Sequence, residues 1–225
     1  MKLIYQGKTK NVYENADGTY TLKLKDDATG KDGVFDPGEN AVGLSIEGLG
    51  RESLKLSAYY FGLLTSKAVP NHYLGSDISA ATMDVLPAKI FGKGLEFVCR
   101  RKADGSFVKR YGQYTAFGAD LDYLVEVTLK DDARLDPPIT KDALCILNIM
   151  SPDEYETCRE LTRKIARLIA EDLAGKGLAL FDIKFEFGKN GDNIILIDEI
   201  SAGCMRVYKD NQIVQPMDLG GLVLG

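Results

Sequence analysis

Residues 180–200, LFDIKFEFGKNGDNIILIDEI, contain the pattern that decides the fold. In the first half, apolar residues at positions 181, 183, 185 and 187 alternate with charged ones, so a strand would place Asp182, Lys184 and Glu186 together on the opposite face. Burying ions without partners costs several kcal/mol each. This charged face must therefore meet water, an ion-pair network or a charged ligand.

The second half returns as another strand. Lys189 to Asp192 is a strong turn signal, and residues 193–197 then lead into Asp198 and Glu199. A loop of three or five residues would place Asp198 on the face of Glu186, whereas a loop of two or four residues would place Glu199 there. The sequence leaves both registers open.

Carboxylates that converge with a lysine suit a Mg²⁺–nucleotide site, because the metal prefers hard oxygen ligands and the phosphates need a cation. A solvated hairpin with cross-strand ion pairs explains the same residues equally well. The hairpin alone favours neither interpretation.

The rest of the chain predicts an α+β fold, because strands come first, then helices, then the hairpin. Ser151-Pro152-Asp153-Glu154 fits a capping box with proline at the first helical position, and apolar residues at helical spacing follow as far as Leu173. The pattern predicts further helices at 50–68 and 141–148. It predicts strands at 3–5, 12–13, 19–25, 82–86, 95–100 and 122–130.

The composition restricts the function. The 225 residues have a net charge of −5, which argues against a general polyanion-binding role. We expect no nucleic-acid and no membrane partner, and a homo-oligomer is compatible with the sequence.

The four cysteines form no C-x-x-C pattern, and no apolar leader or 18-residue apolar stretch is present, so we expect a cytoplasmic protein. The single histidine, His72, argues against a Ser-His-Asp triad and is interpreted as a packing or turn residue.

Two groups of cations are candidates for phosphate binding. Gly7-Lys8-Thr9-Lys10 lies between two predicted strands, where glycine lets backbone N–H groups approach a phosphate, although an ordinary hairpin turn explains it as well. Five cations lie within residues 100–110, around a glycine-serine turn at Ser106, and they suit a phosphomonoester. Arg206 follows the hairpin closely enough to reach the same site, or it is a surface arginine.

These motifs resemble the SAICAR synthetase family over most of the chain and in the same order. The matching stretches are YQGKTKNVY (5–13), LKDDATGKDG (24–33), RRKADGSFVKR (100–110), KDDARLDPPI (130–139), LFDIKFEFG (180–188) and LIDEIS with Arg206 (196–206). The resemblance implies a two-lobed α+β fold with ATP in the cleft. Residues 1–88 would form an antiparallel nucleotide-binding lobe, and residues 89–225 a larger lobe with the metal and substrate phosphate sites.

The resemblance also implies an activity and roles for single residues. An ATP-dependent ligase of purine biosynthesis would join the carboxylate of CAIR to the amine of L-aspartate, with Mg²⁺ as cofactor. Lys8 and Lys10 would hold the ATP phosphates, Met83, Val85 and Leu86 would border the adenine, and Glu186 and Asp198 would bind both the metal and ATP. The CAIR phosphate would lie on Arg100, Ser106, Lys109 and Arg206, with Asp182 and Lys184 as catalytic residues.

The chain departs from the family pattern in several places. Ala202-Gly203 replaces a proline and an aspartate, extra residues occur around 34–44 and 89–94, and no C-terminal helix is expected after residue 221. A paralogous ligase with another acceptor or amine is therefore the main alternative. A kinase-like phosphotransferase and a non-catalytic nucleotide-binding protein are alternatives from other classes.

Overall fold

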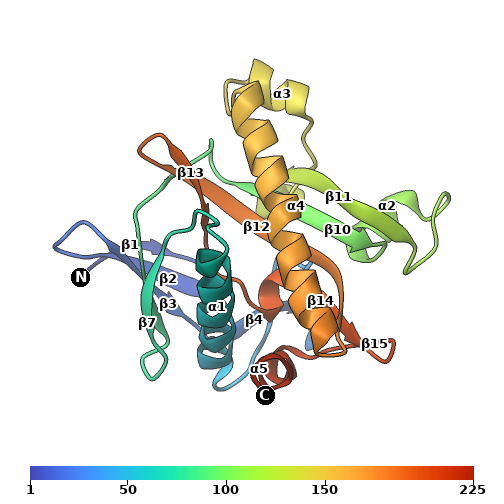
Figure 1. Cartoon of the computed structure of the whole chain (residues 1–225), viewed down its shortest axis with the longest axis horizontal. Helices are drawn as coiled ribbons and strands as arrows, with labels where there is room; N and C mark the ends of the chain where they lie inside the picture. The colour runs from blue at the N-terminus through green and yellow to red at the C-terminus, as the bar shows by residue number, and fades with distance from the viewer.

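The computed structural model describes residues 1–225 and confirms the α+β class. The N-terminal strands form an antiparallel sheet in the order β1-β2-β3-β8-β7, at the left of Figure 1. The strands predicted at 3–5, 12–13, 19–25 and 82–86 are all present in it. The bounds are β1 (Lys2–Gln6), β2 (Lys10–Glu14), β3 (Tyr20–Leu24), β7 (Tyr73–Asp77) and β8 (Thr82–Val85).

The first predicted helix is α1 (Leu49–Ser66), which packs on this sheet through a fully buried face that includes Leu54, Phe61 and Leu64. Asp26 anchors the start of α1, because its carboxylate accepts from the N–H groups of Gly48 and Gly50. Between β3 and α1, the structure contains a small sheet that the sequence pattern did not predict. Its strands are β4 (Asp27–Lys31), β5 (Val34–Phe35) and β6 (Val42–Ser45).

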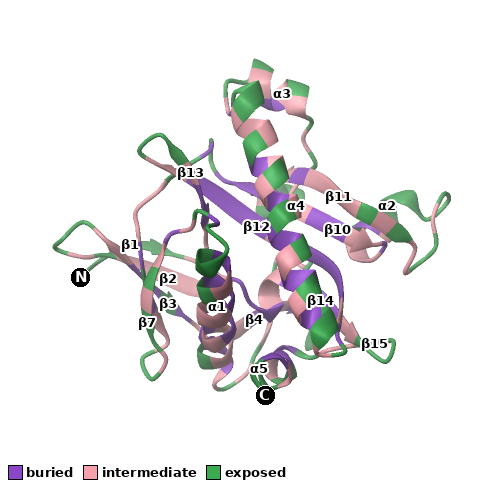
Figure 2. Cartoon of the chain, viewed as in Figure 1, coloured by how far each residue is buried: buried purple, intermediate pink, exposed green.

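A larger antiparallel sheet runs in the order β11-β10-β12-β14-β15, and β13 and β9 also pair with β12. Figure 2 shows that β12, which contains the predicted charged strand, is buried over most of its length. The bounds are β9 (Lys89–Ile90), β10 (Leu95–Lys102), β11 (Asp120–Leu129), β12 (Ala179–Asn190), β13 (Asn193–Ile197), β14 (Met205–Lys209) and β15 (Gln212–Ile213).

The long helix α4 (Pro152–Gly175) crosses this sheet (Figure 1). The predicted capping box is confirmed, since the Ser151 hydroxyl accepts from the Glu154 N–H and the Glu154 carboxylate accepts from the Ser151 N–H. The predicted short helix is α3 (Lys141–Ile146). Two short 3-10 turns cover Asp132–Arg134 and Ala202–Cys204.

Two helices were not predicted. Helix α2 (Gly105–Tyr111) replaces the expected glycine-serine turn, with Asp104 as its N-cap. Helix α5 (Pro216–Leu224) occupies the end of the chain, where no helix was expected, and packs against α1. A single core of 38 buried residues, from Leu22 to Val223, connects the two sheets. No helix combines the length and apolar character needed to cross a bilayer.

One face assignment on β12 is wrong. The pairing of β12 with β14 has a bulge between Leu180 and Asp182, so the alternation of faces is interrupted there. Phe181 consequently stacks on Tyr208, with ring centroids 4.0 Å apart, and lies outside the main core cluster that contains Ile183.

Candidate active site

The register of the hairpin decides which carboxylates come together. The loop between β12 and β13 has two residues, and Glu186 lies opposite Ile197. Alternation alone would then place Glu199 on the face of Glu186, but Asp198 adopts a left-handed backbone conformation with φ 73°, which turns the chain at the end of β13. Both acids reach one lysine: Lys10 Nζ lies 2.6 Å from Glu199 Oε2 and also pairs with Asp198.

A second lysine completes this carboxylate cluster. Lys130 Nζ lies 2.5 Å from Glu186 Oε1. Burial by itself would lower the pKa of Lys10, but the charges of Asp198 and Glu199 outweigh it and raise that pKa well above its ordinary value. The pKa of Lys130 is raised in the same way by Glu186. Lys130 was not predicted as a site residue, although it begins the KDDARLDPPI motif.

The donor set suits a divalent cation that also binds phosphate. Burial and the charge of Asp198 raise the pKa of Glu186, whereas Lys10 and Lys130 hold the pKa of Asp198 well below its ordinary value despite burial. No three acidic, histidine or cysteine side chains converge as a complete metal cage. Mg²⁺ often takes one or two carboxylates and completes its shell with water and phosphate oxygens. Glu186 and Asp198 therefore fit as part of such a shell.

These groups line a cavity between the N-terminal sheet and the β12–β13 hairpin, and the Gly7–Lys10 loop borders it. The Gly7 N–H donates to the Lys10 carbonyl at 2.8 Å, and a Cβ at this glycine would lie only 2.9 Å from that oxygen. Lys8 Nζ contacts the Asn40 carbonyl at 2.9 Å and Asp132 Oδ1 at 2.7 Å. The loop thus brings two cations to this cavity, as phosphate binding would require.

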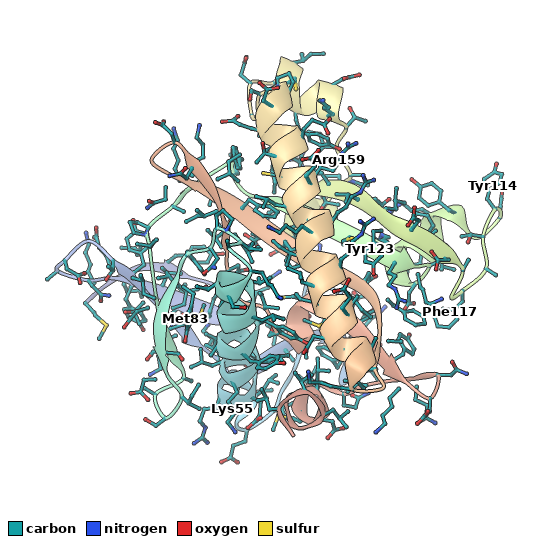
Figure 3. All side chains as sticks on the ribbon, in the orientation of Figure 1. Lys55, Met83, Tyr114, Phe117, Tyr123 and Arg159 are labelled. Atoms are coloured by element: carbon teal, nitrogen blue, oxygen red, sulfur yellow. The ribbon has the colours of Figure 1, made fainter.

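The predicted adenine residues lie apart from this cavity. The side chains of Met83 and Val85 are 0% and 2% exposed in the core, and Met83 lies within the N-terminal part of the fold (Figure 3). The Leu86 N–H donates to the His72 carbonyl at 2.7 Å. None of the three lines the cavity, and their part in binding adenine stays a prediction.

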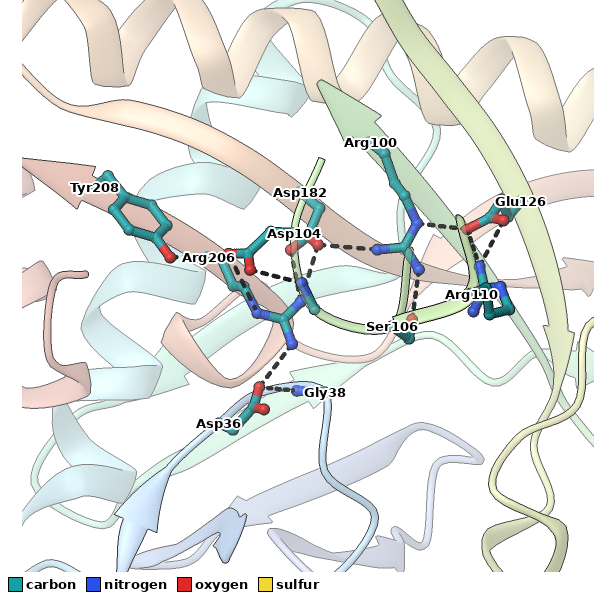
Figure 4. A network of polar contacts seen from close by, with 11 residues as sticks. Asp36, Gly38, Arg100, Asp104, Ser106, Arg110, Glu126, Asp182, Arg206 and Tyr208 are labelled. Carbon is teal, nitrogen blue, oxygen red and sulfur yellow. Dashed lines mark hydrogen bonds and ion pairs between the residues drawn. The ribbon is translucent and has the colours of Figure 1, made fainter. Parts of the chain in front are cut away.

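A second cavity contains the predicted phosphate-binding groups (Figure 4). Arg100 donates from Nη2 to Ser106 Oγ at 2.9 Å and from Nη1 to Asp182 Oδ2 at 3.1 Å. Arg206 donates from Nη1 to Asp182 Oδ2 at 2.9 Å and from Nη2 to Asp36 Oδ1 at 2.6 Å. Asp182 thus contacts both guanidinium groups, and Arg206 lines this cavity with only 8% of its surface exposed rather than lying on the surface.

Lys109 lies at the rim of the same cavity. Its side chain is 70% exposed, and Nζ lies 3.6 Å from Glu39 Oε1. Arg110, the next residue on α2, is instead paired with Glu126 at 2.6 Å. Arg100 and Arg110 therefore both line the cavity with paired guanidinium groups, whereas Lys109 is mostly exposed and only loosely paired.

The two cavities share part of their lining, which includes Glu96, Lys184 and Cys204. Lys184 Nζ donates to Glu96 Oε1 at 2.7 Å. Burial alone would lower the pKa of Lys184, but the charge of Glu96 raises it. The predicted catalytic lysine is therefore a charged group between the cavities. Glu96 was not predicted, because its partner is 88 residues away in sequence.

The loop of residues 36–40, called the acidic loop below, crosses both cavities. It belongs to the segment that the sequence marked only as extra residues. Three predicted site cations contact it. The pairs are Arg206 with Asp36 at 2.6 Å, Lys109 with Glu39 at 3.6 Å, and Lys8 with the Asn40 carbonyl at 2.9 Å.

The chain is similar to known proteins in sequence and in fold. The model of the family described as SAICAR synthetase matches residues 3–218. The chain belongs to the SAICAR synthetase family. A phosphoribosylaminoimidazole-succinocarboxamide synthase from Clostridium tetani is 52% identical, and the match covers 100% of both chains. Its counterpart from Thermotoga maritima is 38% identical over 96% of this chain and 91% of that protein.

Among solved structures, a SAICAR synthetase (Type-2) in complex with ADP superimposes with a TM-score of 0.82. It is 30% identical, and the match covers 93% of this chain and 86% of the other. The likeness therefore extends from the sequence to the whole arrangement of both sheets.

One departure from the SAICAR synthetase pattern faces the first cavity. Gly203, which stands where the resemblance expects an aspartate, lines that cavity and offers no side chain. Its N–H donates to Ser201 Oγ at 3.2 Å within the Ala202–Cys204 turn. The cavity thus lacks one carboxylate beside Lys184 and Cys204.

Proposed function

We propose that this member of the SAICAR synthetase family is an ATP-dependent carboxylate–amine ligase that makes SAICAR, ADP and phosphate from CAIR, L-aspartate and ATP. The observation that best supports this proposal is that two cavities of different chemistry share part of their lining. One contains lysines beside carboxylates, as a metal–nucleotide requires, and the other contains two guanidinium groups beside a serine, as a phosphomonoester requires.

In this proposal, the first cavity binds ATP. Lys8 and Lys10 contact its phosphates. The family resemblance places the adenine beside Met83, Val85 and Leu86, which lie outside the lining of this cavity. Glu186 and Asp198 hold Mg²⁺, which supplies charge neutralisation on the phosphates. Lys10 pairs with Asp198 and Lys130 pairs with Glu186, and these ion pairs support the assignment. On binding, phosphate oxygens would replace the carboxylates as partners of the lysines, and the metal would replace the lysines as partner of the carboxylates.

The second cavity binds the phosphate of CAIR through Arg100, Ser106, Lys109 and Arg206. Lys184 lies between the cavities, where its charge would stabilise the carboxylate that accepts phosphate. Both predicted catalytic residues have a clear place in this scheme. Asp182 contributes by fixing Arg100 and Arg206, since its oxygens accept from both.

The reaction proceeds in two steps. A carboxylate oxygen of CAIR attacks the γ-phosphorus of ATP, and the bond from that phosphorus to ADP breaks. The amine of L-aspartate then attacks the carbonyl carbon, the amide forms, phosphate leaves, and the amine proton is lost to solvent. The protein positions the reactants and neutralises charge, so that no catalytic histidine is needed.

An isotope experiment tests this route. CAIR carrying ¹⁸O in its carboxylate should transfer one ¹⁸O to the released phosphate for each amide formed, which mass spectrometry of the phosphate detects. A stable phosphorylated product would instead favour the kinase-like alternative, and unlabelled phosphate would exclude the acyl-phosphate route.

The comparisons favour SAICAR synthetase over a paralogous ligase with a different amine. Because Gly203 lines the cavity where the family pattern expects an aspartate, a panel of amines offered with CAIR and ATP tests the choice of amine. The SAICAR assignment requires L-aspartate to give the highest kcat/KM in the panel.

We further propose a cytoplasmic location, which the four free cysteines support because thiols stay reduced there. Residues 1–88 would act as the nucleotide-binding lobe and residues 89–225 as the lobe with the metal and substrate sites. The exposed apolar side chains of Leu3, Ile4 and Tyr5 on the edge strand β1 are compatible with a homo-oligomer, which light scattering would detect.

A further inference from the structure

The turn that carries Asp198 and Glu199 is unusual in its backbone. Asp198 has a φ of 73°, a conformation that a residue with a side chain rarely adopts. A strained backbone conformation of this kind persists only where neighbouring groups hold it in place. The hydrogen bonds to residues 198–200 identify the groups that hold this turn.

Three consecutive carbonyl groups of the turn each accept from a side chain of a different segment. His72 Nε2 lies 2.9 Å from the Asp198 carbonyl oxygen, Cys204 Sγ lies 3.4 Å from that of Glu199, and Ser57 Oγ lies 3.0 Å from that of Ile200. These three donors come from the segment before β7, from the turn before β14 and from α1.

The His72 contact has a defined direction. A carbonyl oxygen only accepts, so Nε2 must carry the proton and donate it. The ring is 3% exposed, so that water does not compete for this contact. The backbone N–H of His72 also donates to the Leu196 carbonyl at 3.0 Å. This bond holds the segment of His72 beside β13, two residues before Asp198, whose carbonyl the ring contacts.

The Ser57 contact is double. Its hydroxyl donates to the Ile200 carbonyl and accepts from the Ile200 N–H at 3.2 Å, and the side chain is 0% exposed. Without the hydroxyl, both backbone groups of a buried residue would lose a partner. Neither Ser57 nor His72 lines the first cavity, to which α1 contributes Leu49 and Ser53.

We propose that His72 and Ser57 are positioning residues, which hold the backbone of residues 198–200 so that the carboxylates of Asp198 and Glu199 point into the first cavity. The inference rests on the proposed function, since it assigns those carboxylates to a metal–nucleotide. It replaces the interpretation of His72 as a packing or turn residue. Loss of either contact should weaken the binding of nucleotide with Mg²⁺ more than the binding of nucleotide alone.

The test uses two pairs of variants of the whole chain. His72→Phe keeps a ring but removes the donor, whereas His72→Gln keeps an amide donor. Ser57→Ala removes the hydroxyl, and Ser66→Ala, an exposed serine near the end of the same helix, is its matched control. Calorimetry measures the Kd of ADP with and without Mg²⁺, and thermal unfolding without ligand reports on the fold.

We expect His72→Phe and Ser57→Ala to raise the Kd of ADP with Mg²⁺ roughly 3- to 10-fold, the size of one lost hydrogen bond. The Kd without Mg²⁺ should change by less than about 2-fold on the same scale. His72→Gln should recover most of the loss, and Ser66→Ala should match the unchanged protein. If His72→Phe does not fold, Ser57→Ala carries the test alone.

Equal losses with and without Mg²⁺, or equal losses in His72→Phe and His72→Gln, would overturn the inference. An unchanged protein that binds ADP with Mg²⁺ but forms no SAICAR would contradict the proposed function, and the variant pattern would still decide the inference.

Discussion

Arg206 has an unusual number of acidic neighbours for a group meant to bind a phosphate. Its Nη1 lies 2.9 Å from Asp182 and its Nη2 lies 2.6 Å from Asp36, while Asp104 lies 3.9 Å from its Nε. Asp182 is also bound by Arg100 and is buried. The Asp182 contact therefore orients the guanidinium, whereas the more exposed Asp36 contact is the one that a substrate phosphate would replace.

Arg206→Ala should lower kcat/KM for CAIR by roughly 10- to 150-fold, because a charged hydrogen bond contributes about 1.5–3 kcal/mol. Steady-state kinetics with CAIR varied at saturating ATP and L-aspartate measures this. Lys209→Ala, an exposed lysine on the same strand, is the control. Unchanged values for KM and kcat would mean that Arg206 does not bind the substrate.

Asp198→Asn should reduce Mg²⁺-dependent turnover by roughly 100- to 1,000-fold, the size of losing one preorganised charged group. The amide keeps the shape of the side chain but neither its charge nor its attraction for Lys10. Asp192→Asn in the exposed hairpin loop is the matched control. Full activity of Asp198→Asn would mean that Glu199, and not Asp198, binds the metal.

At the scale of single residues, the sequence predicted the types of group well and their partners poorly. Glu186 was assigned from strand alternation, and it does lie in the cavity. Asp198 and Glu199 could not be ranked, because the sequence does not fix the length of the loop between the strands. The left-handed backbone at Asp198 then also breaks the alternation of faces. Lys130 and Glu96 gain their positions from partners 56 and 88 residues away, which no local pattern encodes.

Among the elements, the acidic loop of residues 36–40 has the largest consequence for binding. It approaches Arg206 so closely that a Cβ at Gly38 would lie 2.3 Å from Nη2. The Gly38 N–H also donates to Asp36 Oδ1 at 2.9 Å, which holds the carboxylate toward the arginine. A phosphorylated substrate must therefore compete with Asp36 for Arg206.

Asp36→Asn should lower the KM for CAIR by about 2- to 5-fold with kcat unchanged, since a partly exposed ion pair contributes up to about 1 kcal/mol. Kinetics with CAIR as the varied substrate gives both constants. Glu39→Gln, which removes only a 3.6 Å contact to an exposed lysine, should have a smaller effect. A higher KM in Asp36→Asn would mean that Asp36 helps to bind the substrate.

The elements with strong local signals were predicted correctly. Helix α4 has a capping box and a sustained apolar stripe, and the β12–β13 hairpin has alternation and a turn. The strands β5 and β15 have two residues each, and β4 and β6 contain glycines, so that their local strand signal is weak although their partners lie nearby in the chain. The same holds for α2, whose seven residues begin with glycine and serine.

At the scale of the whole molecule, the active site belongs to no single part of the chain. The first cavity takes lysines from the start of β2, a lysine after β11 and carboxylates from the β12–β13 hairpin. One core connects the sheets beneath it, and α5 packs back on α1. The α+β class could be derived from the order of elements, but the convergence of these segments required the family resemblance.

The central claim is that both cavities act together on one reaction. The most direct measurement is ADP release by the purified protein with ATP and Mg²⁺, in the presence and absence of each other substrate. We predict rapid ADP release only when CAIR, L-aspartate and Mg²⁺ are all present, with one SAICAR formed for each ADP. ADP release that is unaffected by omitting CAIR or L-aspartate would contradict the account.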